Sequence, residues 1–278
     1  MATMTEMGSA SLTDRDLRAI VALVYEKSGI TLHDGKRELV AARLQKRLRQ
    51  RGRSSYKDYL ARLGDDRSGE ELTLLLDAIA TNHTSFFREP QHFDFLRERI
   101  VPALAAEAGT SGLDAWCAAS SSGEEPVTIA MTLLEAGVDR FRLLASDLST
   151  KVLATARQGV YKLDRVQGVP PALLRKYFQR GLGEQAGLAR VAPEIRQRIE
   201  YRALNLIAMD RLDRTFAFIF CRNVMIYFDK SVQQRVVSML ERYLAPGGYL
   251  FISHSESLNG ITHGMKWVAP AIYRREVK

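Results

Sequence analysis

The sequence predicts an α/β protein in which a small N-terminal all-helical domain precedes a doubly wound, mainly parallel sheet with a small antiparallel β insertion. Two patterns predict it. Residues 11–80 carry apolar residues only at helical spacing, whereas from about residue 113 short apolar runs alternate with amphipathic segments. A chain of 278 residues has room for two domains, which we expect at 1–80 and 96–278, joined by a linker at 81–95.

Four helices are expected in the N-terminal domain. The first begins after Thr13, an N-cap residue followed by acids, and ends at Gly29. The other three show buried-face stripes at helical spacing, namely Val40, Leu44 and Leu48; Tyr56, Tyr59, Leu60 and Leu63; and Leu72, Leu75, Leu76 and Ile79. A further helix, with Phe93, Leu96, Ile100 and Leu104 on one face, follows the linker.

The second domain is expected to form a parallel sheet covered on both faces, because strand-like runs alternate with helical ones. The expected strands are Leu113–Ala118, Phe141–Ala145, Phe216–Cys221 and Tyr249–Ser253. Three glycines interrupt this rhythm within 181–203, where we expect a β-rich insertion that ends in the next strand of the sheet. The run Trp267–Tyr273 is expected to add an antiparallel edge strand.

Composition places the chain among ordinary globular proteins. Hydrophobic residues make up 46% and charged residues 26%, which excludes disordered, collagen-like and disulfide-rich classes. Cys117 and Cys221 lie far apart in apolar runs, as expected in a reducing compartment. No apolar run approaches the roughly 18 residues of a membrane span, and the N-terminus lacks signal-peptide order. We therefore expect a cytoplasmic protein.

The segment 115–127, AWCAASSSGEEPV, is the first candidate site. A strand runs into small residues and then a helix, the place where a doubly wound sheet receives a nucleotide-like ligand. It has one glycine, Gly123, and lacks both the dinucleotide fingerprint and a Gly-Lys-Ser/Thr phosphate loop. Glu124 and Glu125 would repel a pyrophosphate and suit an ammonium or sulfonium ligand. The alternative is an ordinary helix N-terminus with favourable acids.

Asp147 follows Gly123 by 24 residues and ends the second expected strand. An acid at that distance is placed to accept both hydroxyls of a ribose. A solvated acid at a strand end remains the alternative.

The segment 220–229, FCRNVMIYFD, would bring Arg222, Asn223 and Tyr227 to the carboxyl edge of the sheet. It lacks the Pro-Pro-Tyr motif of amino-directed DNA methyltransferases, since Val224 follows Asn223. Cys221 has no preceding proline and is interpreted as a buried strand residue. The run 253–257, SHSES, does not indicate a hydrolase triad, because triad members converge from separate elements.

The linker segment 81–90, TNHTSFFREP, combines polar groups, one arginine and two aromatics. It resembles a lid over a site, and a loop whose Phe86 and Phe87 fill the core is the alternative. His83 has no ligand partners at suitable spacing, so no metal site is expected.

A strongly basic helix is expected from Lys36 to Arg53, with eight Lys or Arg residues against Glu38 alone. These residues carry most of the formal net charge of +8. A solvated face is the usual explanation, and an acidic partner such as nucleic acid or a Glu-rich helix bundle is the other.

Four ordered motifs make the chain resemble the CheR family of chemotaxis receptor methyltransferases from about residue 12 to 275. They are TNHTSFFREP, WCAASSSGEEP, FCRNVMIYFD and GGYLFISHSES. The sequence departs from the family pattern at Ser120 and Val127, which affects the expected affinity for the cofactor. The resemblance implies a methyltransferase domain with a β-subdomain at about 181–203. It also implies methyl transfer from S-adenosylmethionine to glutamate side chains of chemoreceptors, yielding S-adenosylhomocysteine without a metal.

The resemblance also assigns site residues. Those expected to contact the cofactor are Asn82, Thr84, Arg88, Glu125, Asp147, Asn205, Leu206, Cys221 and Arg222. Glu125 is expected at the methionine end and Asp147 at the ribose, with Cys221 and Arg222 contributing backbone. Arg88 and Tyr227 are the expected catalytic residues. The expected partners are the methylation helices of chemoreceptors, at the basic helix, and a receptor C-terminal peptide at the β-subdomain.

An ionised glutamate needs no general base, so we hypothesise that Arg88 positions the carboxylate and Tyr227 lines the methyl passage. Two other functional classes remain, and the first of them would share the cofactor fold. A nucleic-acid methyltransferase would also use the basic helix, and a non-catalytic S-adenosylmethionine sensor would keep the cofactor loop without turnover.

Overall fold

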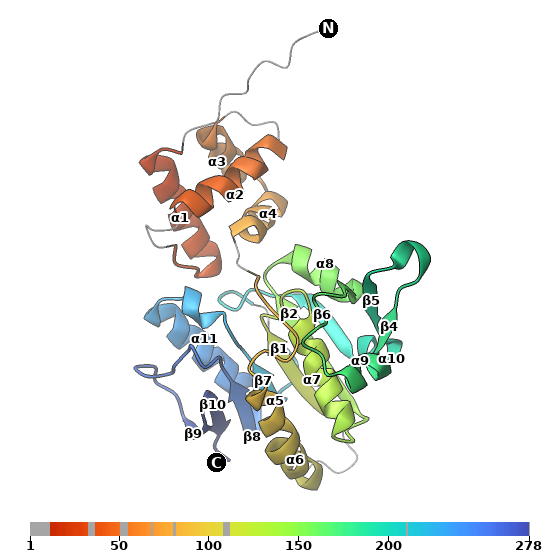
Figure 1. Ribbon diagram of the computed structural model, residues 1–278. Coiled ribbons are helices and arrows are strands. Elements are labelled where there is room, and N and C mark those ends of the chain that lie inside the picture. The colour runs from red at the N-terminus through yellow and green to blue at the C-terminus, as the bar shows by residue number, and fades with distance from the viewer. Residues whose placement is uncertain are drawn as a thin grey trace. The chain divides into compact units, whose positions relative to one another are not determined.

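The computed structural model describes residues 12–32, 37–50, 55–67, 69–79, 82–107, 112–209 and 211–277. The chain forms two compact units, Met1–Thr81 and Asn82–Lys278 (Figure 1). Residues 82–95, expected as a linker, therefore belong to the second unit. No helix within the described ranges is long and apolar enough to span a membrane.

The first unit is helical in its described parts, as predicted. Its helices are α1 (Asp14–Ser28), α2 (Arg37–Gln50), α3 (Tyr56–Asp65) and α4 (Glu70–Ile79). The Thr13 hydroxyl accepts the N–H of Asp16, and Gly29 ends α1 with φ of 72°. Leu44 of α2 and Leu75 of α4 are fully buried, which confirms the predicted stripes.

The second unit contains a seven-stranded sheet with the order β6-β2-β1-β7-β8-β10-β9. Its strands are β1 (Leu113–Ala118), β2 (Phe141–Asp147), β6 (Ile199–Ala203), β7 (Phe216–Phe220), β8 (Leu244–Phe251), β9 (Met265–Ala269) and β10 (Ile272–Arg275). The first five in spatial order run parallel, and β10 and β9 are antiparallel to their neighbours. The predicted edge strand is in fact two strands, because the turn after Ala269 folds the run Trp267–Tyr273 back on itself.

Helices connect these strands and cover the sheet (Figure 1). They are α5 (Gln91–Phe95), which continues through a π-helical turn at Leu96–Ile100 into α6 (Val101–Glu107), then α7 (Glu124–Glu135), α8 (Thr150–Gln158), α9 (Pro171–Tyr177), α10 (Pro193–Arg196) and α11 (Lys230–Tyr243). Four consecutive residues of β1, Ala115 to Ala118, are buried. A strand buried at successive positions has both faces covered, as the sequence predicted.

A small antiparallel sheet of order β3-β5-β4 forms the insertion. Its strands are β3 (Val160–Lys162), β4 (Phe178–Arg180) and β5 (Leu188–Val191). The insertion thus begins at Val160, earlier than the predicted 181–203. The glycines that marked it in the sequence lie in the β4–β5 connection, and the three-residue strand β3 is too short to produce a visible alternation.

The strand order reverses beside β1, because β2 lies on one side of it and β7 on the other. Open α/β sheets bind ligands at this point, outside the carboxyl ends of the strands. The segments that follow β1, β2, β6 and β7 all leave the sheet at this edge. The fold therefore brings the predicted motifs together.

Candidate active site

The loop between β1 and α7 is a tight turn made of small residues. Ala119, Ser121 and Gly123 have φ of 106°, 48° and 98°. A Cβ added at Gly123 would lie 2.8 Å from the Tyr161 hydroxyl and 2.9 Å from Cβ of Ala156. Only glycine fits that position, since both the left-handed backbone and the space exclude a side chain.

Asp147 is fixed beside this loop by two backbone donors. The N–H groups of Ser121 and Ser149 donate to its carboxylate oxygens at 2.8 and 2.9 Å. The N–H of Leu204 donates to the Asp147 carbonyl at 3.0 Å, which brings residues 204–206 to the same edge. Asn205 caps its own turn by accepting the N–H of Ile207 at 3.2 Å. The residues predicted to contact the ribose, Asp147, and the adenine, Asn205 and Leu206, thus lie close together.

The two acids that begin α7 have different surroundings. Glu124 is fully buried and is engaged by the guanidinium of Arg165 and, at 2.7 Å, by the Ser122 hydroxyl. Glu125 keeps 12% of its side chain exposed, and Nη1 of Arg222 lies 2.6 Å from its Oε2. Of the two acids, only Glu125 is partly exposed and faces the segment after β7, so it is the one that a cationic ligand could reach.

Arg222 carries a fully buried guanidinium at the end of β7. Nη1 bonds to Glu125, and Nη2 donates to the carbonyl of Arg88 at 2.7 Å and lies 3.1 Å from Oε2 of Glu89. The guanidinium also stands 5.7 Å from the ring centroid of Phe93. The Arg222 side chain is therefore occupied by groups of the protein itself.

Residues 82–90, which we call the strap, are tied to the rest of the second unit along their length. The carbonyl of Asn82 accepts the Ser121 hydroxyl at 3.3 Å, and the carbonyl of Thr84 accepts Nη2 of Arg165 at 3.3 Å. The N–H of Phe87 donates to the Thr128 hydroxyl at 3.3 Å. The strap therefore contacts the small-residue loop between β1 and α7 at Ser121, and it contacts Arg165 and α7 further along.

Phe86 anchors the strap in the core. It is 3% exposed, and its ring meets those of Tyr161 and Phe178 edge-on at 5.1 and 5.6 Å. Such aromatic contacts add to the free energy gained by burying the ring. Phe86 thus fills the core.

Arg88, two residues further along the strap, is half-buried at the surface. Its Nη1 donates a hydrogen bond to the carbonyl of His83 at 3.0 Å.

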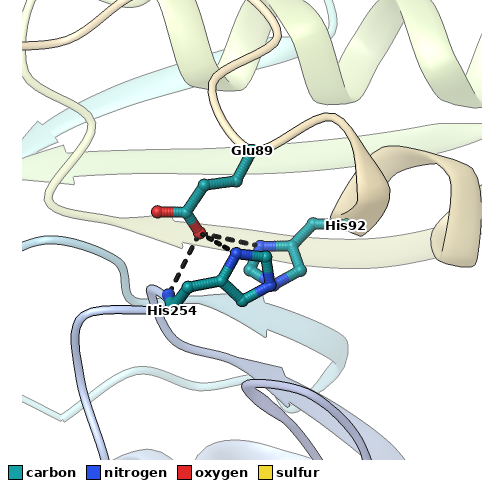
Figure 2. Close-up of side chains that lie close together, drawn as sticks. All are labelled: Glu89, His92 and His254. Atoms are coloured by element: carbon teal, nitrogen blue, oxygen red, sulfur yellow. Dashed lines mark hydrogen bonds and ion pairs between the residues drawn. The ribbon is translucent and has the colours of Figure 1, made fainter.

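Glu89 lies at the end of the strap, and Figure 2 shows it facing His92 and His254. Its Oε1 accepts the Ser253 hydroxyl at 2.7 Å, and its Oε2 accepts the His254 N–H at 3.2 Å. Burial opposes ionisation of Glu89, but the Ser253 hydrogen bond and the Arg222 charge outweigh it and lower its pKa to about 2. Glu89 is therefore ionised at every pH at which the protein is expected to work.

The loop after Arg222, which carries Tyr227, is held by the carboxylate of Glu256. This carboxylate accepts the N–H groups of Ser253, Asn223 and Met225 at 2.8, 3.1 and 2.8 Å. Burial raises the pKa of Glu256 in spite of these bonds. The Glu256 carboxylate thus bonds to backbone groups, and the His254 imidazole lies beside Glu89.

Sequence reasoning missed Glu89, Glu256 and the two histidines. Glu89 and His254 are separated by 165 residues, so no local spacing could have paired them. The sequence did contain one indication, because Glu89 and His254 each lie within a motif that was singled out for other residues. Cys221 is fully buried, which confirms its prediction as a strand-end core residue and raises its thiol pKa well above the ordinary value.

The basic helix is partly used within its own unit. Three of the expected cations, Arg37, Arg43 and Arg47, donate hydrogen bonds to other groups of that unit. The Arg47 guanidinium makes two bonds of 2.9 Å to Glu71. Lys46 and Arg49 are exposed on α2, and the predicted Lys36, Arg51 and Arg53 lie outside the described residues. Within the described residues 37–50, fewer cations are therefore free of partners in the same unit than the sequence alone indicated.

Family models match both units. The model for the SAM-binding domain of CheR methyltransferases matches residues 82–273, and the model for the CheR all-alpha domain matches residues 15–80.

Curated relatives match along nearly the whole chain. A chemotaxis protein methyltransferase of Klebsiella aerogenes is 39% identical over 266 residues, which cover 94% of this chain and 90% of that protein. Chemotaxis protein methyltransferase 2 of Pseudomonas aeruginosa is 40% identical over 94% of this chain and 93% of its own. The solved glycopeptide N-methyltransferase MtfA with sinefungin aligns with 54% of this chain and 47% of its own at 19% identity and a TM-score of 0.32, too low to support an argument.

His92 gives the site a measurable pH dependence. Its side chain is 1% exposed, and burial together with the Arg222 charge lowers its pKa to about 4. The unfolded chain therefore binds this proton more readily than the folded one, and stability falls as the pH drops below about 6.5. We expect the free energy of unfolding to fall by about 2 kcal/mol from pH 7 to pH 5 on account of His92.

Urea unfolding at both pH values, followed by tryptophan fluorescence, measures this loss, because Trp116 and Trp267 both lie in the second unit. The His92→Gln variant should lose most of the difference between pH 7 and pH 5, and His263→Gln should keep it. An unchanged difference in His92→Gln would show that another group is responsible.

Proposed function

The chain belongs to the CheR methyltransferase family, and from that premise we propose that it transfers the methyl group of S-adenosylmethionine to glutamate side chains of chemoreceptors. The products are glutamate methyl esters and S-adenosylhomocysteine. One observation carries the proposal: two fixed carboxylates, Glu125 and Asp147, flank a loop of small residues at the reversal of strand order. A ligand with an ammonium at one end and a ribose at the other fits that arrangement.

The chain offers a group for each part of this cofactor. Glu125 would bind the ammonium of the methionine end, and Asp147 the ribose hydroxyls. Asn205 and Leu206 would border the adenine, since they follow β6 at the same edge as Asp147. Leu206 also lines a groove with Met209 and Met239.

The strap and the β7 end would supply the remaining contacts. Asn82, Thr84 and Arg88 lie on the strap that follows the loop at residues 119–123. Cys221 and Arg222 would contribute backbone, because both side chains are buried.

The bound cofactor supplies a methyl group already activated on a sulfonium. A glutamate carboxylate of ordinary pKa, about 4.3, is ionised at neutral pH, so the chain need not provide a general base. What remains is to hold the nucleophile in line and to exclude water, which is worth roughly 7–11 kcal/mol of the barrier.

Arg88 and Tyr227 would do this from two different segments. Arg88 belongs to the strap, and Tyr227 belongs to the loop that Glu256 holds. Attack neutralises both charges, so an arginine that held the nucleophile too tightly would slow transfer. We therefore assign Arg88 to positioning the carboxylate and Tyr227 to lining the methyl passage.

The partner is an acidic helical surface in this proposal. Lys46 and Arg49 are exposed on α2, and a Glu-rich receptor bundle would be attracted to them. In the small sheet, β3 and β4 are the outer strands, so an extended C-terminal receptor peptide could add to one of them by backbone pairing. Receptor methylation helices lie in the cytoplasm, which is where the enzyme would act.

Methyl transfer is tested with tritiated S-adenosylmethionine and chemoreceptor membranes, by counting methanol released with base. We expect base-labile label in receptor protein. Asp147→Asn should weaken S-adenosylhomocysteine binding about 10–100-fold by calorimetry, the cost of losing charged hydrogen bonds to a hydroxyl pair. Asp114→Asn is the matched control, because Asp114 lies at the opposite end of β1 and pairs with Arg142. Label in nucleic acid, or wild-type affinity in Asp147→Asn, would contradict the proposal.

The basic surface is tested by reversing charge. Lys46→Glu with Arg49→Glu should lower the initial rate of receptor methylation several-fold at low salt and by less at high salt, since screening weakens the attraction. Binding of S-adenosylhomocysteine should stay unchanged. The control pair, Arg15→Glu with Arg18→Glu, makes the same charge change on exposed positions of α1. Equal loss in both pairs would assign the effect to net charge and not to α2.

A further inference from the structure

The buried guanidinium of Arg222 is shared by two carboxylates that come from different segments. Nη1 lies 2.6 Å from Oε2 of Glu125 on α7, and Nη2 lies 3.1 Å from Oε2 of Glu89 on the strap. The Arg222 side chain is fully buried, and those of Glu125 and Glu89 are 12% and 18% exposed. The three groups therefore interact in surroundings that screen charge weakly.

The charges of this group do not balance. A lone Arg222–Glu125 pair would be neutral, and a neutral pair attracts an ammonium ion only weakly. With the carboxylate of Glu89 on the other side of the guanidinium, the group carries one negative charge in excess. Glu125 is the member of the group that lies in the first turn of α7, next to the cofactor loop, so the excess charge is available there.

We propose that Glu89 is a positioning residue for cofactor recognition, acting through Arg222 to leave a net negative charge at Glu125 for the ammonium of the methionine end. This inference rests on the proposed function, because it assumes that Glu125 meets that ammonium. It adds a requirement: the strap must be docked for the charge to be present, since Glu89 is part of the strap.

The geometry holds Glu89 in this role. Its backbone has φ of 56°, a left-handed conformation that is uncommon for a residue with a side chain. The Ser253 hydroxyl and the His254 N–H bond to its two oxygens at 2.7 and 3.2 Å. Its low pKa, about 2, means that the charge does not vary near neutral pH.

A metal ion is the other use that the cluster of Glu89, His92 and His254 suggests, since their ligand atoms lie within 4.8 Å of one another. The imidazole Nδ1 atoms stand 3.5 and 3.7 Å from Oε2 of Glu89. The same oxygen faces Nη2 of Arg222 at 3.1 Å and accepts the His254 N–H. A divalent cation there would lie against the guanidinium, so the observations favour the electrostatic role.

Two ligands separate this role from a general structural one. S-Adenosylhomocysteine carries the ammonium, whereas 5′-methylthioadenosine keeps the adenine and ribose and lacks the amino-acid end. Removing the Glu89 charge should lower the affinity for S-adenosylhomocysteine and leave the affinity for 5′-methylthioadenosine unchanged. A loss of strap or loop structure would lower the affinity for both ligands, because the loop at residues 119–123 and Asp147 would bind the nucleoside that the two ligands share.

The experiment compares the dissociation constants of both ligands, by calorimetry, for the full chain and its variants. Glu89→Gln should raise the dissociation constant of S-adenosylhomocysteine at least 10-fold and that of 5′-methylthioadenosine less than twofold. Glu89→Asp keeps the charge on a shorter side chain and should recover part of the loss. Glu135→Gln is the control, because it removes a carboxylate from the far end of α7, where it bonds to Lys176.

Equal weakening of both ligands in Glu89→Gln would overturn the inference, and so would unchanged affinity for S-adenosylhomocysteine. Tryptophan fluorescence reports whether each variant is folded. If Glu89→Gln does not fold, Glu89→Asp replaces it, because the shorter side chain moves the charge away from Arg222. Its loss of affinity should be smaller but still confined to S-adenosylhomocysteine, and equal loss for both ligands or no loss would overturn the inference. A wild-type protein that binds neither ligand would instead refute the proposed function.

Discussion

The buried guanidinium of Arg222 is the interaction on which the candidate site depends. Arg222 lies in the segment that follows β7, and it joins this segment to α7 through Glu125 and to the strap through Glu89 and the Arg88 carbonyl. A buried cation is costly unless its partners are well placed, and removing one partner leaves an uncompensated charge. This cost couples three segments that are far apart in the sequence, so the strap, the cofactor loop and the strand end keep one arrangement.

General features of the α/β fold place the three segments that Arg222 couples. Parallel strands direct the segments after β1, β2, β6 and β7 to one edge, and small residues at the β1–α7 turn let backbone and ligand approach each other. Backbone N–H groups then fix the acids. Two of them hold Asp147, and Glu256 is held by that of Ser253 in its own loop and by those of Asn223 and Met225 in the loop after Arg222. The chemistry proposed needs little more than orientation, which suits a site built from fixed carboxylates.

Local pattern was enough to predict most of the fold. Apolar stripes and caps fixed α1 to α4, and β1 was predicted with its observed bounds. The three-residue strands β3 and β4 were missed, because short strands leave too few positions for an alternation to show. The C-terminal hairpin was predicted as a single antiparallel edge strand. In the candidate site, Asp147 was predicted from its spacing to Gly123, and Glu125 from its place at the helix start and from the family resemblance. Glu89 was not, because its role arises from a contact with Arg222, which lies 133 residues further along the chain.

The central claim, that Arg222 holds the strap against the sheet edge, is tested most directly by amide hydrogen exchange. In Arg222→Gln, residues 82–90 and 253–257 should exchange at least 10-fold faster than in the wild type, because Glu89 and the Arg88 carbonyl lose their shared donor. Strands β1 and β2 should change much less, and α1 of the first unit should not change. Wild-type protection of the strap in Arg222→Gln would contradict the account.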